Sequence, residues 1–190
     1  IDCPTCDQSG ECDLQDYAYE YGRGQRRCDT DKITQSKKDI GDNIMLYGDR
    51  CIMCTLCVRF TDEISGTSEL MIDGRGANEC IDVFPGIGIN NELSGNVIDI
   101  CPVGAMLDKD FMFKQRVWLL KTVPSIDPLT SSGDNIIIEH NNNQVYRVKP
   151  RTNLEVNDYW ITDEVRYGWK FVHDESRITE MDEDAEIIAA

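Results

Sequence analysis

Nine cysteines carry the chemistry that this sequence could perform, and all of them lie within its first 101 residues. Three fall in the run CIMCTLC, and one comes directly before proline in the run ICPVGA. Two-cluster ferredoxins repeat the pattern C-x2-C-x2-C-x3-C-P, and the fourth cysteine of each repeat binds the other cluster. One 4Fe–4S cluster is therefore held by the first three positions of one repeat and the last of the other. Here those positions are Cys51, Cys54, Cys57 and Cys101.

The second cluster of such a ferredoxin has no ligands in this sequence. Counting by the same gaps places its four ligands at Thr61, Asn91, Ser94 and Val97, and none is a thiol. The pattern therefore predicts a two-cluster domain that keeps one complete cluster and has lost the other. A structural zinc site is the alternative, because zinc also accepts four thiolates. Zinc ligands usually come as two C-x2-C arms, so three cysteines at two-residue gaps favour iron and sulfur.

A second group of cysteines lies at the start of the sequence, in the run CPTCDQSGEC. Cys3, Cys6 and Cys12 supply three thiols, and close C-x2-C pairs in a chain with no secretion signal indicate metal ligands before disulfides. The two histidines, His140 and His173, are distant in the sequence. The isolated Cys28 and Cys80 could serve as the fourth ligand by their chemistry alone, but we expect both to be ordinary buried thiols.

Composition excludes several other functions. Acidic residues outnumber basic residues 35 to 19, and the net charge of −16 argues against a nucleic-acid partner, since such binding relies on Lys and Arg. No run of eighteen apolar residues predicts a membrane-spanning helix. No P-loop or G-x-G-x-x-G motif accompanies the cysteines, so the chain is expected to pass electrons without binding a nucleotide. The first residue is isoleucine, so we expect a fragment or a processed product.

The elements around the cysteines predict an α+β fold. Helices are expected over 13–22, 58–65 and 104–120, the last on a loose 3.6-residue period. The Gly- and Asn-rich stretch 75–96 is expected to be mostly turns, and 135–150 to form a β-hairpin. A domain boundary is expected near residue 118, where the cysteine-rich part ends. The acidic run 180–186 is expected to be solvated.

The runs CPTCDQSGECDLQD, RCIMCTLCVRF and SGNVIDICPVGA closely resemble the large iron–sulfur subunit of respiratory complex I, found in bacterial NADH–quinone oxidoreductase and in its mitochondrial counterpart. The resemblance extends from Ile1 to about Val172. It implies a ferredoxin-like domain with two 4Fe–4S sites over residues 1–118. It also implies that residues 119–190 open a degenerate molybdopterin-oxidoreductase-like domain with no bound molybdopterin. The fourth ligand of Cys3, Cys6 and Cys12 would be a histidine just ahead of Ile1.

Two further clusters of the family are not expected in this sequence. The family's N-terminal ferredoxin-like domain binds a 2Fe–2S cluster, which is expected here only if such a domain precedes Ile1. Some members bind an extra cluster through C-x2-C-x3-C and one later cysteine. The corresponding positions, which we expect to be surface loop residues, are Asp127, Thr130, Asp134 and Thr162. None is a soft thiolate ligand, so no cluster is expected there.

The resemblance implies an electron-relay segment of complex I. Its partners would be other subunits of the peripheral arm, namely the flavin- and NADH-binding subunit and the quinone-proximal iron–sulfur subunits. Its place would be the cytoplasmic face of a bacterial inner membrane or the matrix side of the mitochondrial one. The alternatives are a diaphorase subunit of an NAD-linked hydrogenase or formate dehydrogenase, and a zinc module that only scaffolds partners. Four arginines could raise cluster potentials or serve as surface charges: Arg23, Arg26, Arg50 and Arg59.

Overall fold

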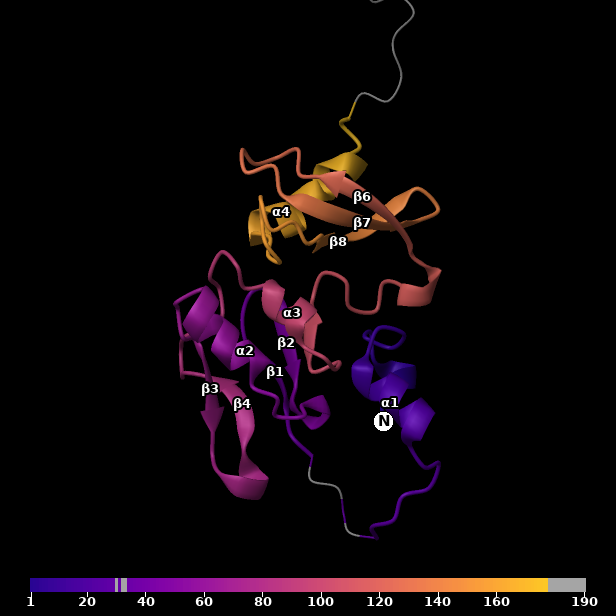
Figure 1. The fold of residues 1–190 in the computed structure, drawn as a ribbon, viewed down its shortest axis with the longest axis vertical. Coiled ribbons are helices and arrows are strands. Elements are labelled where there is room, and N and C mark those ends of the chain that lie inside the picture. Colours follow the sequence, from indigo (N-terminus) through magenta and orange to yellow (C-terminus); the bar gives the residue numbers. More distant parts are fainter. Residues whose placement is uncertain (30, 32–33, 178–190) are drawn as a thin grey trace, which may run out of the picture.

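Short helices and three small antiparallel sheets make up the described part of the chain, as the α+β prediction requires (Figure 1). The computed structural model describes residues 1–29, 31 and 34–177, so the acidic run 180–186 lies outside the described residues. The helices are α1 (Asp13–Tyr21), α2 (Leu56–Arg59), α3 (Asn96–Ile100) and α4 (Asp163–Gly168). Within the described ranges, every helix is too short or too polar to cross a lipid bilayer.

The first sheet has the order β1-β2-β5, from strands Lys37–Asp39, Ile44–Tyr47 and Met106–Asp108. The central strand β2 buries Ile44 and Leu46, and Leu46 pairs directly with Met106 of β5. A separate hairpin, β3 (Leu70–Asp73) with β4 (Cys80–Val83), packs against the same core. This core also contains two of the predicted ligands, Cys57 and Cys101. The fold therefore places part of the predicted ligand set inside its hydrophobic interior.

The last sheet has the order β6-β7-β8 and lies with α4 above the rest of the molecule in Figure 1. Its strands are Lys121–Ile126, Asn135–Asn141 and Gln144–Pro150. The predicted hairpin is confirmed as β7 and β8, joined at Asn142 and Asn143, both with left-handed φ angles of 49° and 62°. Such turns match the twist of paired strands. The edge strand β6 was not predicted, and its Pro124 suits an edge position.

Two of the three predicted helices are present. The helix α1 ends at Tyr21 with Gly22 as its cap, as expected. The second begins at Leu56, two residues before the predicted start, and continues into a π-helical turn at Phe60–Ile64. The stretch 75–96 is mostly turns but contains the short strand β4, which is stabilised by its pairing with β3 and by burial of Ile81 in the core.

The predicted helix over 104–120 is wrong. Its first residues form β5, and only a 3-10 turn at Val117–Leu119 is helical. Met106 pairs with Leu46 of β2, and this strand pairing buries the Met106 side chain in the core. Phe113 has a left-handed φ of 63°, which a right-handed helix does not allow. The loose spacing of apolar residues here reflects two short elements rather than one helix.

A buried polar network joins α3 to the C-terminal part. The side chain of Asn96 is fully buried; its Nδ2 donates to the carbonyl of Ile161 at 2.8 Å, and its Oδ1 accepts from the Ile161 amide at 3.2 Å. Arg166 is also buried, and its Nη2 donates to Asp99 at 2.6 Å and to Asn96 at 3.3 Å. Buried polar groups need such partners, so this network fixes the two parts against each other.

Substituting Asn96→Ala should leave the Ile161 amide and carbonyl unpaired inside the protein. A buried unsatisfied polar group costs roughly 1–3 kcal/mol, so we expect the free energy of unfolding to fall by at least about that amount. Denaturant titration followed by circular dichroism measures the change. The exposed Asn78→Ala is the control and should stay within about 0.5 kcal/mol of the parent. An Asn96→Ala protein as stable as the control would contradict the network.

Candidate metal centres

The four cysteines predicted from the ferredoxin spacing come together around one small cavity. Cys51 and the exposed Cys54 lie on the loop that leads into α2, Cys57 is buried within α2, and Cys101 directly follows α3. Two residues of this loop, Met53 and Thr55, have left-handed φ angles of 54° and 63°. Such angles are unfavourable for residues with side chains, and they curl the loop around the cavity. The fold thus unites three local cysteines with one that is 44 positions beyond Cys57 in the sequence.

Ionisation of the thiols in this set is unfavourable unless a cation lies among them. Burial, together with the neighbouring Cys101, Cys51 and Cys54, raises the pKa of Cys57 to about 12. Metal ligation requires deprotonated thiols, and a bound cation offsets this shift. Four soft sulfur donors are the ligand set of a 4Fe–4S cluster, so the residues fit that group. The enclosed space is about 10 Å³, so the thiol side chains must turn apart to bind it.

Backbone amides support the sulfurs of this set. The amide of Met53 donates to Sγ of Cys51 at 3.3 Å. Burial raises the pKa of Cys101, whereas backbone hydrogen bonds from Val103, Met106 and Ala105 lower it. Hydrogen bonds to the sulfurs and burial are the factors that tune the potential of an iron–sulfur cluster.

The N-terminal cysteines line a second and larger cavity of about 650 Å³. Cys3 begins a 3-10 turn (Cys3–Thr5), Cys6 follows that turn, and Cys12 caps α1. Between the last two, Gly10 takes a φ of +98°, which lets the loop reverse. Cys6 and Cys12 are buried and Cys3 is half-buried. Three soft sulfur donors around one cavity again suit an iron–sulfur cluster that takes its fourth ligand from elsewhere.

Two arginines and one glycine hold the N-terminal loop in place. Arg50 donates to the carbonyls of Thr5 and Gly104, both at 3.4 Å. Burial raises the pKa of Cys6, and the charge of Arg50 offsets part of that rise. Arg116 donates to the carbonyl of Cys6 at 2.8 Å. A Cβ atom on Gly104 would lie 2.2 Å from Sγ of Cys6, so only glycine fits there.

Of the four arginines named from the sequence, Arg50 lies beside a cysteine set, whereas Arg23, Arg26 and Arg59 are exposed. The role of Arg116 was not predicted, because it reaches Cys6 across 110 positions of sequence that show no local signal.

The two cysteine sets are neighbours. Nε2 of Gln8, in the N-terminal loop, donates to the carbonyl of Cys101 at 3.2 Å in a buried position. The amide of Asp13 donates to the carbonyl of Pro102 at 3.1 Å. Cys51 lines both cavities. The sequence did not indicate this adjacency, since the sets are separated by 38 positions between Cys12 and Cys51.

The positions of the lost ferredoxin cluster are filled by packed side chains. Thr61, Ser94 and Val97 are all buried, and the Thr61 hydroxyl donates to the carbonyl of Val58 at 2.9 Å. The Ser94 hydroxyl donates to Asp163 of α4. The remaining position, Asn91, is half-buried and hydrogen-bonded to neighbouring side chains. These contacts are structural and involve no thiol.

The positions of the family's extra cluster also have structural roles. The carboxylate of Asp127 accepts the amides of Leu129 and Thr130 at 3.0 Å and 2.8 Å. The Thr162 hydroxyl caps α4. Asp127 and Asp134 are buried, so the expectation that they are surface loop residues is wrong for these two. Their carboxylates need partners inside the fold, and for Asp127 the turn supplies them.

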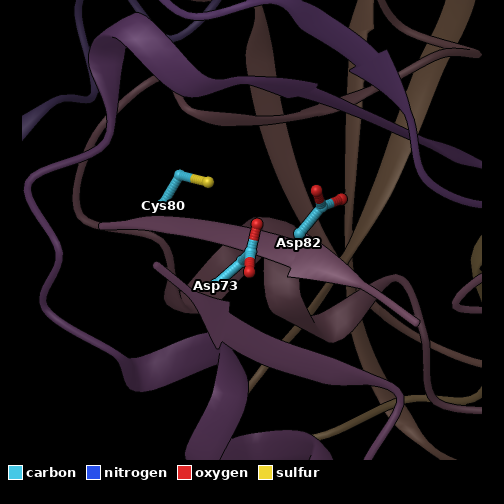
Figure 2. A group of neighbouring side chains, drawn as sticks. All are labelled: Asp73, Cys80 and Asp82. Atoms are coloured by element: carbon cyan, nitrogen blue, oxygen red, sulfur yellow. The ribbon is translucent and has the colours of Figure 1, made fainter. Parts of the chain in front are cut away.

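The isolated cysteines differ from their expected burial. Cys28 is exposed, so its prediction as a buried thiol is wrong, and Cys80 is half-buried. Figure 2 shows Cys80 on β4 beside Asp73 and Asp82, whose ligand atoms all lie within 4.8 Å of one another. Strand pairing places Asp73 opposite Cys80, a proximity that the sequence alone did not reveal. Asp82 forms an ion pair with Lys38, so its carboxylate is already neutralised by the Lys38 ammonium group.

Comparison with known families matches three parts of the chain. Residues 1–27 match the NADH-ubiquinone oxidoreductase-G iron-sulfur binding region. Residues 41–107 match the ferredoxin-like domain of NADH-quinone oxidoreductase subunit 3. Residues 120–170 match the NADH-ubiquinone oxidoreductase NDSU1/NuoG-like 4Fe-4S domain, although this segment contains no cysteine here.

Curated relatives agree with these matches. The mitochondrial NADH dehydrogenase [ubiquinone] iron-sulfur protein 1 of Solanum tuberosum is 45% identical over 167 residues, covering 88% of this chain and 23% of that protein. The 75 kDa subunit of NADH-ubiquinone oxidoreductase from Acanthamoeba castellanii is 44% identical, covering 89% and 25%. A bacterial NADH-quinone oxidoreductase subunit, from Rickettsia felis, is 41% identical over the same shares. The chain spans about a quarter of the length of these relatives.

Among solved structures, an NAD+-reducing [NiFe]-hydrogenase in its H2-reduced state superimposes with a TM-score of 0.53 at 31% identity. The match covers 61% of this chain and 51% of the hydrogenase chain. The family matches and the curated relatives are more extensive and agree with one another. The chain belongs to the family of the large iron–sulfur subunits of NADH–quinone oxidoreductase, which includes the 75 kDa subunit of mitochondria and its bacterial counterparts.

Proposed function

We propose that this chain relays single electrons within an NADH–quinone oxidoreductase, from a flavin-containing NADH module toward quinone. The observation that carries the proposal is the gathering of seven cysteines into two adjacent sets, joined by the Gln8–Cys101 hydrogen bond. The relatives' names supply the enzyme in which such a relay operates. No substrate chemistry is assigned to the chain itself.

Two 4Fe–4S clusters are proposed as the cofactors. One would be held by Cys51, Cys54, Cys57 and Cys101. The other would be held by Cys3, Cys6, Cys12 and a histidine preceding Ile1. No molybdopterin is proposed, and a 2Fe–2S cluster only if the family's N-terminal domain precedes this segment.

When bound, the clusters supply one-electron exchange without proton or substrate chemistry. The chain's own residues set the conditions for it. Cys57 and Cys101 are buried in the core whereas Cys54 is exposed, and this degree of solvent access is one of the factors that set a cluster's potential. The Met53 amide donates to one sulfur and the Arg50 guanidinium lies near another, and both favour the more negative, reduced state of a nearby site.

The domain division proposed from the sequence is residues 1–118 for the iron–sulfur domain and 119–190 for the opening of a degenerate molybdopterin-oxidoreductase-like domain. Two hydrophobic clusters support a division, because the buried residues of one lie within residues 12–106 and those of the other within residues 136–169, with Trp160 packed against the first. The proposed partners are the flavin- and NADH-binding subunit and the quinone-proximal iron–sulfur subunits. The proposed location is the peripheral arm, on the cytoplasmic side in bacteria or the matrix side in mitochondria.

The alternative function is electron transfer in an NAD-linked hydrogenase or formate dehydrogenase. The superposition on an NAD+-reducing hydrogenase favours it. The proteins that purify with the full-length subunit decide between the two functions. A quinone-reducing membrane arm indicates NADH–quinone oxidoreductase, whereas a nickel- or molybdenum-containing catalytic subunit indicates the hydrogenase or formate dehydrogenase. Colour distinguishes a zinc-only scaffold from an iron–sulfur protein, because the iron–sulfur protein is brown and bleaches with dithionite, whereas the zinc protein is colourless.

Substituting Cys54→Ala should abolish one EPR signal of the reduced protein and leave a second, because it removes one of four ligands from a single site. Iron content should fall in parallel. Cys28→Ala is the control, since that thiol is exposed and belongs to neither set. A spectrum unchanged by Cys54→Ala would refute this ligand set.

Substituting Gly104→Ala should affect the other signal. The new methyl group would lie 2.2 Å from the Cys6 sulfur, which is too close for both to stay in place. The Cys6 side chain would therefore have to move away from its position in the N-terminal set. We expect the EPR signal that survives Cys54→Ala to be lost or strongly changed. Gly24→Ala, where a Cβ atom meets nothing within 4 Å, should leave both signals intact. Retention of that signal in Gly104→Ala would contradict the placement of Cys6.

A further inference from the structure

We propose that the C-terminal sheet β6-β7-β8 holds the N-terminal cysteine loop in its ligating geometry, and that Arg147 of β8 is the positioning residue through which it acts. The inference rests on the proposed function, because it concerns the cluster assigned to Cys3, Cys6 and Cys12. It gives a role to a segment, residues 119–172, that contains no cysteine and binds no cluster in the proposal above.

The contact is a two-pronged ion pair between distant parts of the chain. Nη1 and Nη2 of Arg147 donate to Oε1 and Oε2 of Glu11, each at 2.8 Å. Glu11 directly precedes Cys12, which caps α1. A guanidinium that meets a carboxylate through two parallel hydrogen bonds fixes both distance and orientation. The position of β8 therefore constrains the backbone that carries Cys12.

Arg147 is itself held rigidly. Its Nε donates to Glu139 on the neighbouring strand β7, and its guanidinium carbon lies 4.4 Å from the ring centroid of Phe111. Its side chain is only 13% exposed. Lys149, two residues further along the same face of β8, places Nζ 3.3 Å from Oε2 of Glu11. The sheet thus presents two cations to one carboxylate of the loop.

A purely stabilising role explains this arrangement poorly. Taking paired charges out of water is costly, and apolar side chains of similar volume often stabilise a fold as well or better. What a buried two-pronged pair supplies is a defined geometry. The loop needs one, because it contains few apolar anchors and its sulfurs must meet iron at fixed distances. Arg50 and Arg116 hold the first half of the loop around Cys6, and Gln8 binds the carbonyl of Cys101. In the second half, the Glu11–Arg147 pair directly precedes Cys12, and the hydrogen bond from the Asp13 amide to the carbonyl of Pro102 directly follows it.

The test replaces the arginine in the assembled complex that contains the chain. Partners outside the first ligand shell typically change metal affinity by roughly 10- to 100-fold when mutated. In Arg147→Met we expect the EPR signal that depends on Cys6 to shift, and to disappear at least roughly ten-fold faster under an iron chelator than in the parent. The signal that depends on Cys54 should keep its shape and its rate of loss. Arg147→Lys, which keeps the charge without the two-pronged contact, should show an intermediate rate.

Arg151→Met is the matched control. Arg151 follows β8 directly, and its contacts, to Ser125 and Asn135, remain inside the sheet. If it accelerates the loss of the Cys6-dependent signal as much as Arg147→Met does, the effect is general destabilisation and the proposal is wrong. Equal effects of Arg147→Met on both signals, or an effect on neither, would also overturn it.

Coupling to Glu11 provides a second readout. In a Glu11→Gln background, Arg147→Met should add much less than it does alone, because both substitutions break the same contact. Fully additive effects would contradict the proposal. The Cys54→Ala variant separates this inference from the proposed function. If Cys54→Ala removes a signal and Arg147→Met changes nothing, only the positioning role fails. If Cys54→Ala removes no signal, the proposed function fails and this inference fails with it.

Discussion

The structure depends on keeping several thiols close together inside an apolar core. Cys12, Cys57 and Cys101 belong to the same hydrophobic cluster as the central strand β2. Burial and mutual proximity make ionised sulfur unfavourable there, as the raised pKa of Cys57 reflects. A bound cation removes that penalty. The same side chains therefore serve as core and as candidate ligands, so the fold and the metal centres are expected to stabilise each other.

The conformation of the N-terminal loop is held mainly by contacts with residues that are distant in the sequence. Gly104 makes room for Cys6, Arg116 binds the loop carbonyls, and Gln8 reaches the carbonyl of Cys101. Arg147 binds Glu11 at the end of the loop. Every one of these partners lies more than ninety positions away in the sequence. This arrangement joins the two cysteine sets into one unit, which suits a relay in which electrons pass between neighbouring sites.

The sequence predicted which cysteines the fold would bring together, because their spacing is local and the ferredoxin rule links distant repeats. It also predicted α1 and the β7–β8 hairpin, where Gly22 and the adjacent asparagines mark the ends. It failed for β5, because the pairing of Met106 with Leu46 overrides a weak helical pattern. The contacts of Arg116 and Arg147 could not be predicted, since charged residues on short strands look like surface residues until the fold brings their partners close. The exposure of Cys28 was missed because a lone cysteine has no local signal for burial.

The most direct test of the central claim is an anomalous-scattering map of the assembled complex, with data collected on both sides of the iron absorption edge. The account predicts two compact iron peaks, one among Cys51, Cys54, Cys57 and Cys101 and the other against Cys3, Cys6 and Cys12. Each peak should be bounded by cysteine sulfurs. A single zinc-edge peak, or no metal at either set of cysteines, would contradict it.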